Sequence, residues 1–267
     1  MIQVRRLYKS FGEPVLRGVE LNVPPGRLVG LVGAPASGKS VLLRVIAGLL
    51  EPDAGSVKVR GQELVGLGYA RRARLMASIG MAFQNIALFD HLTVGENVAF
   101  PLRRREKLAE AEVQERVAFE LAAVGLSGFE ERAVQGLSGG QKRRVGIARA
   151  AVTRPPVLLY DEPAAGLDPV STSRMFSLLV EQKRRLGSTL LVVSSDLDRL
   201  FEVTDEVILL HAGRVLCQGP LERVLANPHP AAREFLEGVR APSVGPSPSL
   251  LPAADRDGPL PPGAFFP

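Results

Sequence analysis

A glycine-rich stretch at residues 33–40 has the residue types and spacing that hold phosphate groups. It matches the pattern G-x-x-x-x-G-K-[ST] and consists of Gly33, Ala34, Pro35, Ala36, Ser37, Gly38, Lys39 and Ser40. The glycines let backbone N–H groups approach phosphate oxygens, and the helix expected from Val41 onward adds the positive end of its dipole. Lys39 supplies a point charge and Ser40 an oxygen for Mg²⁺. Residues 33–41 therefore predict a nucleotide site, but they do not distinguish a kinase, a GTPase or a transporter ATPase.

A pair of carboxylates follows a second apolar run. Residues 157–160 are all apolar or aromatic and lead into Asp161, Glu162 and Pro163. Next to a phosphate loop, an aspartate in this position holds Mg²⁺, usually through water. The glutamate after it is placed to act as general base toward an attacking water. The alternative is a surface turn, since Asp-Glu-Pro also suits a turn.

Strand and helix patterns alternate along the chain and would position these groups. Residues 19–23 alternate with period two, and 55–65 and 205–218 have hairpin patterns. Continuous apolar runs at 28–32, 157–160 and 190–194 are typical of strands buried on both faces. Helical patterns cover 105–125, 141–153 and 169–185. The order predicts an α/β fold with a mainly parallel sheet, an N-terminal antiparallel β subdomain and a helical subdomain inserted at about 90–153.

Composition limits the other possibilities. We expect one domain over residues 1–239 and a disordered tail over 240–267, where eight of the chain's 21 prolines lie in residues 242–267. No run of about 18 apolar residues suggests a membrane span, and no signal peptide precedes the domain, so we expect a cytoplasmic chain. The net charge is +5, but the basic residues are scattered and lack an interleaved aromatic platform, which disfavours nucleic acid as a partner. A single cysteine, Cys217, excludes an internal disulfide.

The pentapeptide Leu137-Ser138-Gly139-Gly140-Gln141 resembles the signature of ATP-binding cassette (ABC) ATPases. Together with the phosphate loop and the carboxylate pair, this resemblance implies the ABC ATPase fold and ATP hydrolysis. Ser138 stands where a helix N-cap is favoured, so its hydroxyl, the Gly140 N–H and the helix dipole can form an anion site. Because the chain's own phosphate loop already covers one face of ATP, the signature is expected to receive the γ-phosphate of ATP held by a second copy. The resemblance therefore implies a dimer, expected to be a homodimer.

Three further positions extend this resemblance. It implies that Phe11 stacks on adenine, although an ordinary core aromatic is the alternative. It implies that Gln84 senses Mg²⁺ and water and communicates with a membrane partner, and that Asp168 belongs to the D-loop. ATP and Mg²⁺ are the implied ligands, with Ser40, Gln84 and Asp161 around the metal.

One position departs from the family pattern. The family usually carries a γ-phosphate-contacting histidine at the position of Ser195, 34 residues after Asp161, and none of the chain's three histidines falls there. Exchanging a charge-assisted contact for a neutral one could cost on the order of 1–2 kcal/mol. We therefore expect a slow ATPase in which Glu162, Gln84 and Ser195 form the catalytic group. A regulatory cassette that barely hydrolyses ATP is the alternative.

The segment 84–103 is similar to the ATPases of Mla/MCE-type phospholipid transporters, and so are residues 219–238. This similarity implies separate transmembrane permease subunits, possible association with an MCE-type lipid-binding protein, and a peripheral position on the inner face of the cell membrane. Ile86, Leu88 and Phe89 would provide an apolar seat for a permease helix. The alternative is generic importer sequence, as in importers of amino acids and other small polar solutes. A DNA-repair or translation ABC protein is disfavoured because the chain has one cassette and no long coiled-coil insertion.

Overall fold

Two sheets organise the chain, of which the computed structural model describes residues 1–105, 108–227 and 229–240. The smaller sheet is antiparallel, in the order β2-β1-β4-β5. Its strands are β1 (Ile2–Phe11), β2 (Glu13–Val23), β4 (Ala54–Val59) and β5 (Gln62–Glu63). Alternating buried and exposed residues along β2 match the expected period of two, since one face of this sheet packs on the protein and the other faces solvent.

The larger sheet has six strands in the order β10-β9-β3-β8-β7-β6. They are β3 (Leu28–Val32), β6 (Ile79–Ala82), β7 (Val157–Asp161), β8 (Thr189–Val193), β9 (Glu206–His211) and β10 (Arg214–Gly219). Every neighbouring pair is parallel except β9 and β10, which form the antiparallel hairpin expected at 205–218. All residues of β3, β7 and β8 are buried, as expected for central parallel strands covered on both faces.

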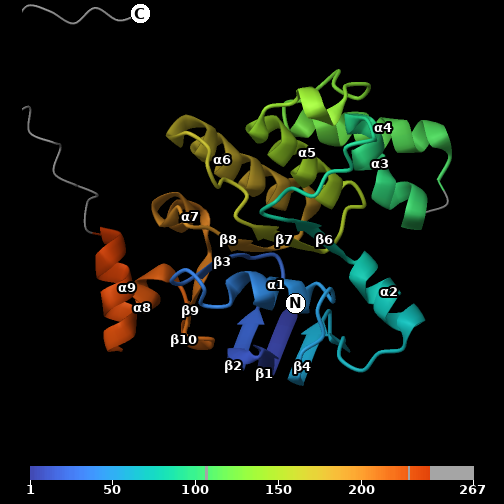
Figure 1. The fold of residues 1–267 in the computed structure, drawn as a ribbon. Helices are drawn as coiled ribbons and strands as arrows, with labels where there is room; N and C mark the ends of the chain where they lie inside the picture. Colours follow the sequence, from blue (N-terminus) through green and yellow to red (C-terminus); the bar gives the residue numbers. More distant parts are fainter. Residues whose placement is uncertain (106–107, 228, 241–267) are drawn as a thin grey trace, which may run out of the picture.

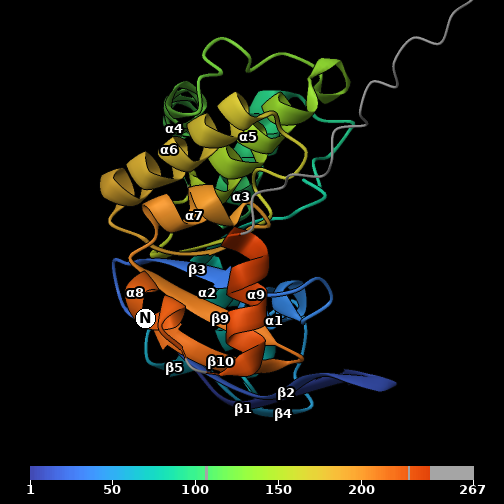
Figure 2. The same cartoon turned by 90° about the vertical axis from the view of Figure 1, so that its left-hand side faces the viewer.

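Helices cover the two faces of this sheet. They are α1 (Lys39–Ile46), α2 (Tyr69–Ala77), α3 (Val94–Arg105), α4 (Glu110–Ala123), α5 (Gly139–Ala151), α6 (Pro169–Leu186), α7 (Leu197–Val203), α8 (Leu221–Leu225) and α9 (Pro230–Arg240). In Figure 1, α3 to α6 lie above the six-stranded sheet, while α1 lies between it and the antiparallel sheet. Figure 2 shows this arrangement from the side, with β1, β2 and β4 at the bottom and α8 and α9 beside β9 and β10. The α/β fold with an antiparallel β region is confirmed.

The pleat of the parallel strands divides the core in two. On β8, Leu190 and Val192 belong to the cluster that contains α3, α4, α5 and α6. Leu191 and Val193 belong to the other cluster, with α1 and the antiparallel sheet. Because successive side chains of a strand point to opposite faces, one short strand holds both layers together. The loops at the carboxyl ends of these strands are therefore held rigidly from both sides.

Helix boundaries differ from the expectation at several places: α1 begins at Lys39 rather than Val41, and two differences are larger or have a clear cause. The helix expected over 105–125 is wrong at its start, because α3 ends at Arg105 and α4 begins at Glu110. The charged sequence suits a helix throughout, but Val98 and Val117 contact the same core cluster, which one straight helix could not reach from both sides. The next helix begins at Gly139 rather than Gln141, since Ser138 caps it. The expected disordered tail, apart from Arg240, lies outside the described residues.

Candidate functional site

The phosphate loop joins β3 to α1 at the carboxyl edge of the parallel strands, where α/β sheets bind ligands. Its glycines are required by backbone geometry. Gly33 has φ +151°, and a Cβ there would lie 2.0 Å from the carbonyl oxygen of Leu210. Gly38 has φ +101°, and its Cβ would press against Leu16 of β2. The loop can therefore turn sharply between a strand and a helix while its backbone stays open to a ligand.

Cationic and hydroxyl groups converge on this loop. The Lys39 Nζ donates to the carbonyl oxygens of Gly33 and Ala34 at 2.7 and 2.9 Å. Burial lowers the pKa of the Lys39 ammonium, while the carboxylates of Glu162 and Asp161 act in the opposite direction. Ser37 is 5% exposed, and its Oγ has no hydrogen-bond partner among the described residues. A cavity of about 250 Å³ lies here, lined by Val15 and residues 36–41. An ammonium, an unpaired hydroxyl and a helix N-terminus around one cavity fit phosphate groups.

Two of the three residues expected around the metal, Ser40 and Asp161, meet across the sheet. Ser40 donates its hydroxyl to the Asp161 Oδ1 at 3.0 Å. Asp161 ends β7 and is 2% exposed. Burial raises the pKa of its carboxyl, and the hydrogen bond from Ser40 partly offsets this rise. Among the described residues, no cluster of three or more His, Cys, Asp or Glu side chains could hold a metal by itself. One carboxylate and one hydroxyl beside a phosphate cavity fit Mg²⁺, which keeps waters and phosphate oxygens as its other ligands.

Glu162 and Ser195 are brought into direct contact. The Ser195 N–H and Oγ both donate to the Glu162 Oε2, each at 3.0 Å. Glu162 has φ +51°, and its own N–H donates to the Val193 carbonyl at 3.0 Å. A non-glycine residue in this region is strained, and such strain occurs at functional sites. The sequence did not predict this contact. It arises because Asp161 pairs in parallel with Val193, which places the two following loops side by side.

The signature residues lie at the start of α5. Ser138 is the N-cap: its Oγ accepts from the Gln141 N–H at 3.3 Å, and its N–H donates to the Gln141 Oε1 at 2.8 Å. This capping box leaves the N–H groups of Gly139 and Gly140 at the positive end of the helix. A cavity of about 580 Å³ adjoins Ser138 and Gly140. No phosphate-loop residue lines it, so the two expected halves of an ATP site are separate surfaces of one chain.

The remaining expected residues lie on exposed positions around these surfaces. Phe11 ends β1 with 59% of its surface exposed, so it is not the core aromatic considered as an alternative. Asp168 is the N-cap of α6 and accepts from the N–H groups of Val170 and Ser171 at 3.0 Å each. Hydrogen bonds from Ser171 hold the pKa of Asp168 below its usual value. Gln84 is exposed in the loop after β6.

An apolar groove follows Gln84. Its volume is about 410 Å³, and its walls come from β6, the loop after it, α3 and α5. Of the three residues expected to seat a permease helix, only Phe89 lines it; Ile86 and Leu88 do not. Ala87, Phe100 and the stem of Arg149 take their place. Ile86 instead turns toward α5, where its Cγ2 is 3.5 Å from the position a Cβ on Gly146 would take.

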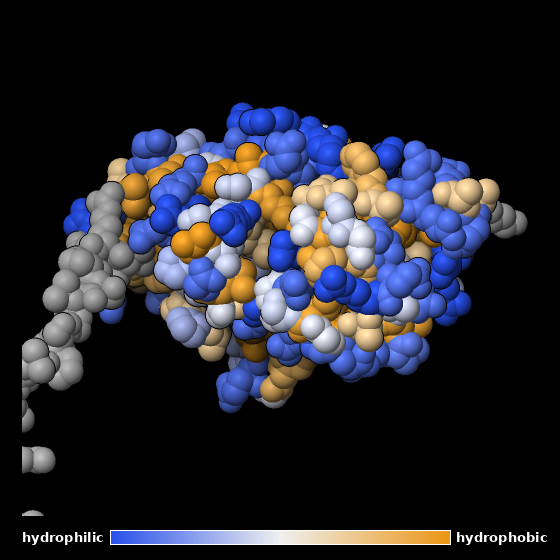
Figure 3. All heavy atoms as spheres, turned by 90° about the horizontal axis from the view of Figure 1, so that it is seen from above, coloured by the Kyte–Doolittle hydropathy of each residue, from blue (hydrophilic) through white to orange (hydrophobic). Residues whose placement is uncertain are grey.

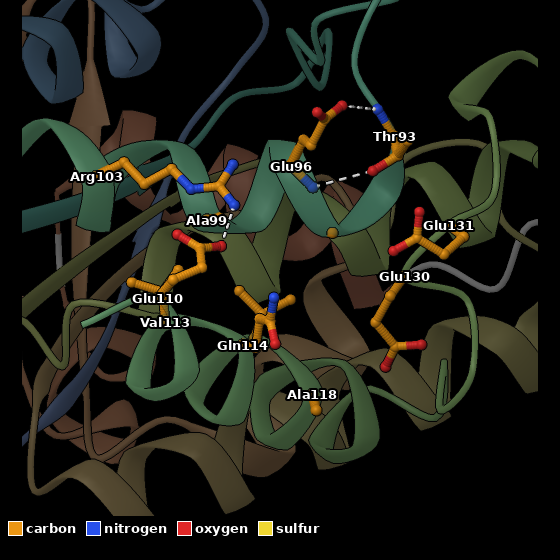
Figure 4. A pocket seen from close by; sticks show the side chains of 12 residues that line it. Thr93, Glu96, Ala99, Arg103, Glu110, Val113, Gln114, Ala118, Glu130 and Glu131 are labelled. Atoms are coloured by element: carbon orange, nitrogen blue, oxygen red, sulfur yellow. Dashed lines mark hydrogen bonds and ion pairs between the residues drawn. The ribbon is translucent and has the colours of Figure 1, made fainter. Parts of the chain in front are cut away.

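A further cavity is lined by none of the expected site residues. Figure 4 shows a cavity between α3 and α4 in which Glu110 pairs with Arg103, while Glu96 exchanges hydrogen bonds with Thr93. Its remaining carboxylates come from Glu130 and Glu131. Seen from above, the helical face is mostly hydrophilic, with separate hydrophobic patches (Figure 3). None of the helices formed by the described residues is apolar and long enough to serve as a membrane span.

Comparisons with known proteins match this arrangement. A family model described as "ABC transporter" matches residues 16–165. The methionine import ATP-binding protein MetN of Caulobacter vibrioides is 43% identical over 248 residues, covering 91% of this chain and 74% of that protein. The chloroplastic protein TRIGALACTOSYLDIACYLGLYCEROL 3 of Arabidopsis thaliana is 38% identical, covering 89% and 74%. A dimeric structure of the ATP-binding cassette MJ0796 in a post-hydrolysis state, bound to ADP and phosphate, superposes with a TM-score of 0.77 at 30% identity, covering 83% of this chain and 99% of that one.

Proposed function

We propose, from the premise that this chain belongs to the ABC transporter family and is an ATP-hydrolysing cassette, that two copies close on ATP and drive a separate membrane permease. The observation that carries the proposal is the convergence of Lys39, Ser40 and Asp161 at one edge of the sheet, with Glu162 beside them. On its own a phosphate loop would fit many nucleotide enzymes. A phosphate loop and a capped signature helix on separate surfaces fit a two-copy site.

In the proposed site the chain's own residues bind and orient ATP. The backbone of residues 33–41 and Lys39 hold the phosphates, and Phe11 stacks on the adenine. Ser40 and Asp161 would hold Mg²⁺, with Gln84 nearby; the ion supplies charge neutralisation at the phosphate oxygens. Glu162 accepts a proton from the attacking water. Ser138, Gly139, Gly140 and Gln141 of the second copy cover the γ-phosphate, and Asp168 lies at the contact between copies.

The surrounding assembly is part of the same proposal. Residues 1–239 act as the ATPase domain, with the helical subdomain at about 90–153 facing the permease. The apolar groove beside Phe89 is the seat for one permease helix, because aromatic and aliphatic walls of about 410 Å³ suit the apolar face of a helix. The chain would then be peripheral on the inner face of the membrane.

Two substrate classes are supported by different relatives. A lipid substrate, with an MCE-type protein as a further partner, is supported by the pattern of residues 84–103 and by the glycolipid in the name of the Arabidopsis relative. Import of an amino acid such as methionine is supported by the Caulobacter relative at higher identity. The site itself binds only ATP, so the permease decides between them. We propose lipid transport, with methionine-type import as the second candidate.

The hydrolytic part is tested on the full-length chain. We expect steady-state ATP hydrolysis that requires Mg²⁺ and falls by about a hundredfold or more in Glu162→Gln and Lys39→Ala. The matched control is Glu202→Gln, an exposed carboxylate on α7 away from both cavities. Hydrolysis that survives Glu162→Gln unchanged would exclude this site as its source.

The transport part is tested on the complex that co-purifies with the chain. The complex is placed in vesicles of phosphatidylethanolamine and phosphatidylglycerol, and ATP turnover and the transfer of labelled phospholipid are measured with and without L-methionine. ATP-dependent phospholipid transfer supports the lipid proposal. Turnover and uptake that depend on methionine, without phospholipid transfer, support the second candidate instead.

A further inference from the structure

Two strained residues follow Gln84 by two and three positions. Ile86 has φ +59° and Ala87 has φ +48°, both in the left-handed region. Isoleucine is β-branched, which makes this conformation especially unfavourable. Strained residues of this kind persist only where the surroundings hold them. The turn that carries Gln84 therefore needs an external partner.

That partner is Arg149, near the carboxyl end of α5. Its Nη1 donates to the Ala87 carbonyl at 2.8 Å, and its Nη2 donates to the Ile86 carbonyl at 2.9 Å. One planar guanidinium thus bridges the two strained peptides. In the part of the chain that the structure describes, Arg149 pairs with these carbonyl oxygens and forms no ion pair. Burial lowers its pKa, a cost that the two short hydrogen bonds offset.

The same turn packs along α5 at a second point. The Ile86 side chain lies over Gly146, one turn before Arg149, at the distance of ordinary van der Waals contact from a Cβ built there. A larger residue at 146 would meet Ile86. The loop is therefore fixed to one face of α5 by an apolar contact and by two hydrogen bonds.

The other end of α5 carries the signature. Ser138 caps the helix eleven residues before Arg149, which is about 16 Å of helix. Between these two ends α5 is one uninterrupted helix, and its residues Val145 and Ala148 are buried. This helix therefore connects the signature to residues 86 and 87, which follow Gln84 closely in the chain. This link lies within one chain. It connects the side that would hold one ATP with the signature, which would cover the second ATP of the proposed dimer.

We propose that Arg149 is a positioning residue that holds the strained 86–87 turn to the signature helix and thereby sets the place of Gln84. This rests on the proposed function, since Gln84 matters only if the site hydrolyses ATP. Arg149 itself touches no reacting atom. Its loss changes catalysis through the turn, while the phosphate loop that binds ATP remains intact.

The test compares Arg149→Met and Arg149→Lys with the unchanged full-length chain. Methionine keeps an unbranched stem but removes both donors, and lysine keeps the charge but cannot bridge two carbonyls in a plane. We expect kcat to fall about tenfold or more in Arg149→Met, with the KM for ATP changed by less than about threefold. Amide hydrogen exchange of residues 84–88 should rise in the same variant.

A variant that relieves the backbone strain distinguishes the positioning role of Arg149 from a general effect on the stability of the chain. Glycine adopts left-handed φ without penalty. Ala87→Gly in the Arg149→Met background should therefore recover part of the lost kcat. The control is Arg72→Met, because Arg72 also joins a helix to a loop carbonyl, that of Gly48 at 2.7 Å, away from the site. Arg72→Met should leave kcat unchanged.

Each outcome decides the proposal. If Arg149→Met does not fold, Arg149→Lys takes its place, with the same expected split between kcat and KM. Unchanged kcat in the folded Arg149 variants, or equal losses in Arg149 and Arg72 variants, would overturn the positioning role. If the unchanged chain shows Glu162-dependent hydrolysis, such a result leaves the proposed function standing.

Discussion

Single residues at the site combine unusual backbone geometry with direct chemistry. Ala36 in the phosphate loop and Glu162 after β7 both have positive φ, +59° and +51°. Glu162 is further held by Ser195 through two hydrogen bonds at 3.0 Å. Both of these strained residues lie where the chain contacts ATP in the proposed site, as expected when geometry is maintained for function.

Ser195→His should increase ATP turnover, by about tenfold if the missing charge-assisted contact accounts for 1–2 kcal/mol. The imidazole can reach a phosphate oxygen that the serine hydroxyl, engaged with Glu162, does not. Steady-state hydrolysis at saturating ATP measures the effect. Ser195→Ala is the control: it removes the hydroxyl and adds no donor, so no increase is expected. An unchanged or lower rate in Ser195→His would contradict the slow-ATPase hypothesis.

Ala36→Gly should stabilise the chain by about 1 kcal/mol, because glycine removes the left-handed penalty at φ +59°. The expected rise of the thermal midpoint is about 2–4 °C for a chain of this size. Ala34→Gly is the matched control, since Ala34 is not among the positive-φ residues. The control should be neutral or slightly destabilising. Equal effects of both substitutions would argue against strain at Ala36.

At the scale of elements, a buried ion pair joins α4 to α6. Glu120 is 2% exposed and accepts two hydrogen bonds from Arg185, at 2.7 and 2.6 Å. Next to it the hydroxyl of Tyr160 on β7 donates to Gln182 of α6. Burial raises the pKa of Tyr160 out of the titratable range, so the phenol remains a donor. The strand that ends in Asp161 is thus connected to α6 and, through the ion pair, to α4.

Arg185→Met should therefore destabilise the chain by about 3–5 kcal/mol, because the Glu120 carboxylate stays buried without its partner. The additional Glu120→Leu substitution should recover most of this loss, since it removes the unpaired charge. Urea unfolding measures both variants. Arg199→Met provides the comparison: its pair with Glu202 is exposed, and a change of less than about 1 kcal/mol is expected. A small loss in Arg185→Met would show that the pair is not a structural link.

At the scale of the whole molecule, the two functional surfaces belong to different layers. The phosphate loop adjoins α1 and the antiparallel sheet, while the signature begins a helix of the upper layer (Figure 1). The cavities at the two places share no lining residue. In the proposed dimer, each ATP would lie between the phosphate loop of one copy and the signature of the other.

Two inactive variants should therefore complement each other. Lys39→Ala removes phosphate binding, and Ser138→Arg fills the signature; alone, each should be inactive. When mixed in equal amounts before ATP is added, half of the dimers contain one intact site of two, so about a quarter of the unchanged rate is expected if the sites act independently. ATP hydrolysis of the mixture is compared with that of each variant alone. A mixture as inactive as its components would contradict the shared site.

The sequence by itself determined the chemistry and the fold class. The glycines and Lys39 at 33–40, the apolar run ending in Asp161 and the strand periodicities depend on local spacing, which the order of residues contains directly. Only the tertiary structure decided which residues meet across elements: Ser195 with Glu162, Arg149 with residues 86 and 87, Arg185 with Glu120. The break between α3 and α4 was also decided there. These features arise from strand order and from packing into a shared core, and contacts between distant segments leave no periodic signal in a single sequence.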